Sequence, residues 1–122
     1  MRSLGLIAGG VLCALAVAAG AFGAHALHDR LDAASLQIWE TAARYLMYTG
    51  LGLLGIGASQ LQLPRAGFLL AELALLAGGV VFTSSLFALA IGGPRWLGAV
   101  TPIGGVGMIA GFLLFAWSAL RG

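Results

Sequence analysis

Four long apolar runs, separated by short polar segments, account for most of the chain. They cover residues 4–27, 38–61, 66–91 and 97–120. Each run provides the roughly 20 residues that an α-helix needs to cross a bilayer. The pattern therefore predicts an all-α fold, an integral membrane four-helix bundle, built as a single transmembrane domain over residues 1–122.

The first two runs carry additional signals. Arg2 precedes the first run, and residues 24–26 (AHA) resemble the cleavage site of a secretory signal. The apolar stretch is longer than the about 7–15 residues of such signals, so we predict a retained helix and keep cleavage as the alternative. In the second run Glu40 and Arg44 lie on a different side from the apolar residues, which predicts a helix entering the membrane obliquely, capped by Asp32 or Ser35.

Composition supports a membrane protein and excludes several classes of function. Hydrophobic residues make up 61% of the chain and charged residues only 8%, against about 25% charged in soluble domains. The formal net charge of +2 comes from six arginines and four acidic residues, which is too sparse for binding nucleic acid. Cys13 is the single cysteine and lies in an apolar run, so neither a disulfide nor a paired-cysteine metal site is expected.

Glycine is abundant, at 20 residues, and many glycines and other small residues are spaced four apart. Such spacing places small residues on one helix face, where the backbones of membrane helices approach closely. We expect these residues to pack inside the bundle. The alternative is that Gly5 and Gly9 form a dimer face. The predicted packing residues are Gly5, Gly9, Gly20, Gly104, Gly105, Gly107 and Gly111.

Two segments resemble a known family. The first combines residues 20–27 (GAFGAHAL), 39–42 (WETA) and 45–48 (YLMY), and the second is residues 95–106 (RWLGAVTPIGGV). Together they resemble the DUF423 family, also called UPF0382, of small bacterial inner-membrane proteins. The resemblance implies four membrane spans and an uncleaved first helix, and it leaves the activity open. Thr49, where relatives often carry His, and residues 83–87 (TSSLF), which replace a Ser-Gly-Ser-Leu-Tyr-like run, depart from the pattern.

An even number of spans places both termini on one side of the bacterial inner membrane. Three arginines then lie on the side of the termini (Arg2, Arg65 and Arg121) and two on the other (Arg30 and Arg95). By the positive-inside rule, both termini are expected to be cytoplasmic. The numbers of arginines on the two sides become equal, at three each, if Arg44 lies at the interface opposite the termini.

Polar residues within the apolar runs are the candidates for a ligand site: His25, Glu40, Arg44, Tyr45, Tyr48 and Glu72. Glu40 and Arg44 have the spacing of a helical ion pair. One interpretation is that they anchor the second helix at the interface; the other is that they line a polar cavity with His25 and Tyr45. Glu72 lies about 10 Å beyond Arg65 along a helix.

An acid at the depth of Glu72 must be protonated, paired or hydrated, so it marks a possible functional site. The alternatives are a neutral acid hydrogen-bonded across the bundle, a proton or substrate site, and a position nearer the interface. His25 and His28 could share one side of a helix end, but two ligands make half a metal site, and a hydrogen-bonded histidine is favoured. Residues 83–85 (TSS) lack a His or Asp partner arrangement and are expected to bond within their helix.

Three classes of function remain. The first is an accessory or assembly component that packs against a larger membrane protein complex or forms a homo-oligomer. The second is an oligomeric transporter or channel for a small solute or protons, using intramembrane Glu, Arg and His. The third is an interfacial enzyme acting on a lipid or a quinone. Small loops, glycine-rich helices and the lack of a catalytic motif favour the first, so we expect no catalytic residue, metal or cofactor, and membrane lipids as partners.

Overall fold

Helices make up nearly all of the computed structural model, which describes residues 4–121. In chain order they are α1 (Leu4–His25), α2 (Ala33–Gln62), α3 (Ala66–Ala90) and α4 (Leu97–Arg121). No strand occurs among the described residues. The prediction of an all-α, four-helix membrane fold is confirmed.

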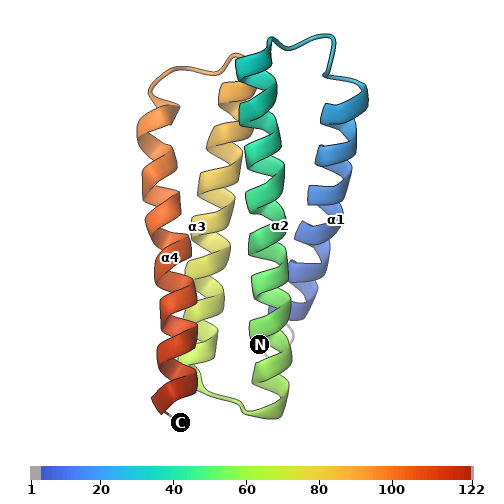
Figure 1. Cartoon of the computed structure of the whole chain (residues 1–122). Coiled ribbons are helices and arrows are strands. Elements are labelled where there is room, and N and C mark those ends of the chain that lie inside the picture. Colours follow the sequence, from blue (N-terminus) through green and yellow to red (C-terminus); the bar gives the residue numbers. More distant parts are fainter. Residues whose placement is uncertain (1–3, 122) are drawn as a thin grey trace.

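The helices stand side by side in an open row (Figure 1). Neighbouring helices run in opposite directions, and α1 packs on α2, α2 on α3 and α3 on α4. Within residues 4–121, α1 and α4 make no contact. Both described chain ends lie with the α2–α3 connection at one end of the row, called here the terminal end, while the connections at 26–32 and 91–96 form the loop end (Figure 1).

Three of the helices, α1, α3 and α4, are long and apolar enough to cross a membrane. The remaining helix, α2, is the longest at 30 residues and carries more polar residues. It begins five residues before the predicted span, because the Asp32 side chain accepts a hydrogen bond of 2.7 Å from the Ser35 amide and caps the helix. The hydrogen bonds from Ser35 hold the pKa of Asp32 below its ordinary value.

Glycine brings the backbones of α1 and α2 together. A methyl group added to Gly9 would lie 2.7 Å from the Gly50 carbonyl oxygen and 2.8 Å from the Leu54 amide nitrogen. One added to Gly57 would lie 2.8 Å from the Leu6 amide nitrogen. Gly5 and Gly9 are buried in this contact, so they face α2 rather than a second copy of the chain.

A second glycine contact joins α3 and α4. A methyl group on Gly78 would lie 2.5 Å from the Met108 amide nitrogen, and one on Gly107 would lie 2.9 Å from the Gly78 Cα. Gly104 and Gly111 pack equally tightly against the backbone of α3. At this separation the backbones themselves are in van der Waals contact, which is how helices gain attraction in lipid.

Polar groups tie the helices together at both ends. At the loop end the Trp39 indole donates a 2.8 Å hydrogen bond to the Ala19 carbonyl, and the hydroxyls of Ser85 and Thr101 lie 2.6 Å apart between α3 and α4. At the terminal end the Arg65 guanidinium donates a 3.0 Å hydrogen bond to the Ala119 carbonyl. Because the last carbonyls of a helix lack intrahelical partners, Arg65 caps α4.

The glycine contact between α1 and α2 predicts opposite effects for two adjacent substitutions. Gly9→Ala should lower the free energy of unfolding by about 1–3 kcal/mol, because the new methyl group meets backbone atoms that cannot move aside. Gly10→Ala should leave it unchanged or raise it by up to about 1 kcal/mol, because nothing lies within 4 Å of a methyl group there and alanine favours helix. Unfolding in mixed detergent micelles, followed by circular dichroism, measures both; equal losses would contradict the packing.

Candidate functional site

Among the described residues, Glu72 is the one residue with an ionisable side chain that is fully buried, with 0% of its surface exposed. It lies in the second turn of α3 and faces the first turn of α1, where its carboxyl group contacts Gly5. Neither carboxyl oxygen has a hydrogen-bond partner among the described residues. The neighbouring amides at the start of α1 carry the positive end of the helix dipole, which is the favourable surrounding for an acid.

Gly5 is what makes room for this carboxyl group. Any side chain at that position would collide with the Glu72 carboxyl group and with the Leu53 carbonyl oxygen, 2.6 Å from an added Cβ. Phe68, Ala71 and Leu75 are buried on the same helix. Among the described residues, the Glu72 carboxyl group therefore lies beside apolar side chains and backbone groups of α1 and α2.

The other ionisable candidates lie at the opposite end of the row. Glu40 and Arg44 occupy the early turns of α2 and are exposed, and His25 is exposed at the end of α1. The single ion pair among residues 4–121 joins His28 and Asp29 at 3.3 Å, so Glu40 and Arg44 do not pair. The structure thus separates Glu72, near the terminal end, from His25, Glu40 and Arg44 near the loop end, and Tyr45 and Tyr48 lie near the middle of α2.

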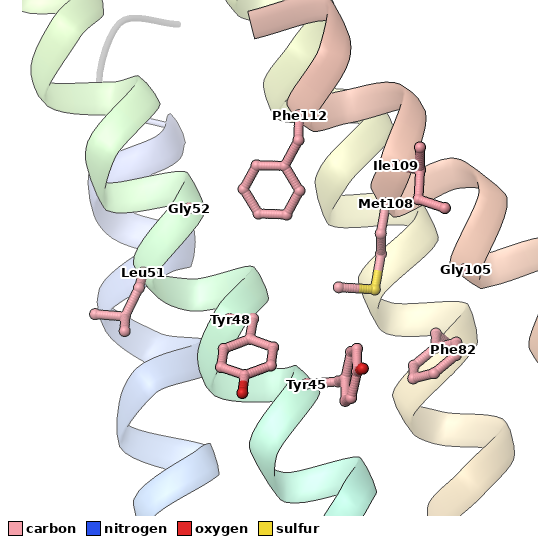
Figure 2. Close-up of a pocket in the computed structure, with 9 residues that line it drawn as sticks. All are labelled: Tyr45, Tyr48, Leu51, Gly52, Phe82, Gly105, Met108, Ile109 and Phe112. Carbon is pink, nitrogen blue, oxygen red and sulfur yellow. The ribbon is translucent and has the colours of Figure 1, made fainter. Parts of the chain in front are cut away.

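A groove of about 730 Å³ opens between α2 and α4, with α3 as its floor. Tyr45 and Tyr48 form its border on α2, with their ring centres 5.1 Å apart, and Tyr45 also packs at 5.0 Å on Phe82 of α3 (Figure 2). The residues lining the groove are Tyr45, Tyr48, Leu51, Gly52, Phe82, Gly105, Met108, Ile109 and Phe112. Apart from the two hydroxyl groups, the side chains of this lining are apolar.

Sequence reasoning identified the two tyrosines but missed the aromatic residues opposite them. Phe82 meets Tyr45, and Phe112 meets Gly52, only because α2 and α4 flank α3, and no sequence spacing encodes that juxtaposition. Gly105, predicted as a packing residue, lines the groove beside the Phe82 ring. Gly20, from the same set, has nothing within 4 Å of an added methyl group.

The hydroxyl groups of Thr49 and Thr83 bond backbone carbonyls within their own helices. Thr49 is fully buried, bonds the Tyr45 carbonyl at 2.9 Å and packs against Gly79. Thr83 bonds the Gly79 carbonyl at 2.8 Å, as expected for hydroxyls that back-bond within a helix. No group of three or more His, Cys, Asp or Glu residues that could hold a metal ion occurs among residues 4–121.

Long apolar helices packed through glycine define a small helical membrane protein. The family model described as a protein of unknown function, DUF423, matches residues 19–105. The chain therefore belongs to the DUF423 family, as its two sequence segments predicted.

Relatives extend over nearly the whole chain. A UPF0382 membrane protein of Staphylococcus epidermidis is 43% identical over 120 residues, covering 95% of this chain and 94% of the relative. The UPF0382 membrane protein YwdK of Bacillus subtilis is 36% identical over 117 residues, covering 95% of each chain. No solved structure matches the chain significantly. The chain is thus a membrane protein of the UPF0382 family, and these relatives are bacterial membrane proteins.

The buried carboxyl group predicts an unusual stability effect. Glu72→Leu should leave the free energy of unfolding unchanged or raise it by about 1–3 kcal/mol, because an apolar side chain removes a buried carboxyl group that has no hydrogen-bond partner among the described residues. Phe68→Ala, which removes a buried side chain from the same helix, should lower it by about 3–5 kcal/mol and shows that the assay detects core changes. A large loss in Glu72→Leu, measured by the same detergent unfolding, would mean that the carboxyl group stabilises the fold.

Proposed function

We propose that this protein is a non-catalytic accessory or assembly component that packs laterally against a larger membrane protein. The observation that carries the proposal is the open row, in which α1 and α4 each have a single extensively packed neighbour. A helix at the edge of such a row has most of its surface available to other helices of the membrane.

The outer side of α1 is suited to helix association. Gly10, Ala14 and Ala18 are exposed at successive four-residue intervals, on a different side of α1 from the buried Gly5 and Gly9. Nothing lies within 4 Å of a methyl group added at Gly10. Helices with small residues in this arrangement approach one another closely in lipid, so we assign a transmembrane helix of the partner to this side of α1.

The proposal includes a topology. All four helices cross the bacterial inner membrane, with α2 carried between the more apolar α1 and α3. Both termini are cytoplasmic, in line with the arginines at 2, 65 and 121. The groove between α2 and α4 then opens to lipid within the membrane.

Substitution of the outer side of α1 tests the partner. The double variant Gly10→Leu and Ala14→Leu should fold normally, because both positions are exposed, and should lose a stoichiometric partner that native purification in mild detergent retains with the wild type. Mass spectrometry of the intact assembly measures the stoichiometry.

The matched control places bulk elsewhere on the surface. Leu113 on α4 is 64% exposed, and Leu113→Phe should retain the partner. A wild-type protein that purifies alone, or a partner lost equally in both variants, contradicts the assignment to α1.

A second candidate function is favoured by Glu72 alone. A fully buried carboxyl group without a partner among the described residues is the kind of group that binds and releases protons in membrane transporters. This second function would make the chain an oligomeric proton-linked transporter, because the groove of a single copy is lined almost entirely by apolar side chains.

Proton movement into sealed vesicles distinguishes the second candidate. Wild-type vesicles should lose an imposed proton gradient faster than protein-free vesicles, and Glu72→Gln should abolish the difference, since an amide cannot carry the proton. Gradient decay is followed with a pH-sensitive dye enclosed in the vesicles. Equal decay with wild type and with protein-free vesicles rejects proton transport.

A further inference from the structure

We propose that the groove between α2 and α4 is a phospholipid site selective for a headgroup with a primary ammonium, such as phosphatidylethanolamine. One acyl chain lies in the groove, the phosphate contacts Arg44, and the ammonium contacts Glu40. The site does not depend on the partner protein proposed above, because none of its residues lies on the outer side of α1.

The groove has the size and chemistry for an acyl chain. Its volume of about 730 Å³ lies within the about 300–1,000 Å³ of small-molecule sites, and its lining is almost wholly apolar. Gly105 keeps the α4 side of the groove low, Phe82 of α3 lies at its floor, and the Phe112 ring of α4 packs on Gly52 of α2 at one end (Figure 2).

The tyrosines supply polar atoms where an acyl chain would join its glycerol. Tyr48 is 45% exposed, and Figure 2 shows its hydroxyl directed along α2 toward the earlier residues of that helix. The described residues give neither tyrosine hydroxyl a hydrogen-bond partner. A tyrosine hydroxyl can donate a hydrogen bond to an ester carbonyl. The other side chains that line the groove are apolar and offer no such donor.

Charged residues continue the same column of α2 beyond the groove. Tyr48, Arg44 and Glu40 are four residues apart, so each lies about 6 Å further toward the loop end on nearly the same helix face. A phospholipid with an ammonium headgroup has its groups in the matching order: acyl chain, ester, phosphate, ammonium. The order of complementary groups on α2 is apolar groove, tyrosine, arginine and glutamate.

Both charged side chains are available to a ligand. Glu40 and Arg44 are exposed, and they form no ion pair with each other or with another described residue. Arginine binds phosphate through paired N–H groups, and a carboxylate accepts charge-assisted hydrogen bonds from a primary ammonium. A trimethylammonium headgroup offers charge without N–H donors, and a glycerol headgroup offers no positive charge.

A second groove on this row of helices lacks the combination of unbonded tyrosine hydroxyls with a neighbouring arginine and glutamate. It opens between α1 and α3, over α2, and has a volume of about 340 Å³. Its hydroxyl groups, on Thr83 and Ser84, already bond helix carbonyls, and no charged residue lines it. Of these two grooves, the one between α2 and α4 has the aligned Arg44 and Glu40 beyond its tyrosines.

Lipid binding by the purified full-length protein tests the proposal. Intact-protein mass spectrometry in detergent measures the retention of phosphatidylethanolamine, phosphatidylcholine, phosphatidylglycerol and diacylglycerol with identical acyl chains. We expect the wild type to bind phosphatidylethanolamine about tenfold more tightly than phosphatidylglycerol, with phosphatidylcholine between them. Equal binding of the three phospholipids by the wild type overturns the proposal.

Three variants assign the selectivity to residues. Glu40→Gln should remove the preference for phosphatidylethanolamine over phosphatidylglycerol, and Arg44→Gln should weaken all three phospholipids while leaving diacylglycerol unchanged. Gly105→Leu should weaken every lipid, because the added side chain enters the groove beside the Phe82 ring, 3.5 Å from an added Cβ. Gly20→Leu on α1, where nothing lies within 4 Å of an added Cβ, is the matched control and should bind as the wild type does.

The two α2 variants keep the proposal decidable even if Gly105→Leu fails to fold, because Glu40 and Arg44 are exposed. A Glu40→Gln variant that keeps the full preference for phosphatidylethanolamine overturns the assignment of the ammonium. An Arg44→Gln variant that binds phospholipids normally overturns the assignment of the phosphate.

Discussion

Contact between helix backbones through glycine is the constraint on which the rest of this structure depends. Lipid tails are as apolar as leucine side chains, so burying one apolar helix against another gains little in a membrane unless the helices approach closely. Gly9 and Gly50 provide that approach between α1 and α2, and Gly78 and Gly107 provide it between α3 and α4. Larger side chains at these positions would separate the helices.

The same contacts determine the shape of the groove. With α4 held against α3 at Gly78, the Phe112 side chain of α4 projects toward α2. Phe112 reaches Gly52 of α2, where a methyl group would lie 2.7 Å from the Phe112 ring. The apolar groove is thus a product of close packing on one side of α3 and bulky side chains on the other.

Much of the fold could be predicted from the sequence, because four apolar runs of membrane-spanning length permit few arrangements other than antiparallel helices. The start of α2 was harder to predict than its membrane-spanning part, because residues 33–37 do not form an apolar run. The cap provided by Asp32 sets the first residue of this helix. The open row was not predictable either. Helix α3 is apolar on all sides, so no periodic pattern indicates which of its faces meets another helix.

The candidate residues could be predicted only as separate groups. Ionisable residues in an apolar run are conspicuous, which is why Glu72, Glu40 and Arg44 were found. The sequence does not show that Glu40 and Glu72 lie apart. Each lies in an early turn of its helix, and because α2 and α3 run in opposite directions, those turns lie at opposite ends of the row. The partners of Tyr45 on α3 and α4 come from residues far along the chain, which spacing within one helix cannot reveal.

The order of the helices in the row has a consequence for biogenesis. Every extensive contact joins helices that are consecutive in the chain, and α1 never has to meet α4 within the described residues. Each helix after α1 therefore finds an extensively packed neighbour already made when it leaves the ribosome, and no pairing has to wait for a helix more than one position later. Contacts between segments close in sequence form fastest during folding, so the row can assemble as two successive helical hairpins, α1 with α2 and then α3 with α4.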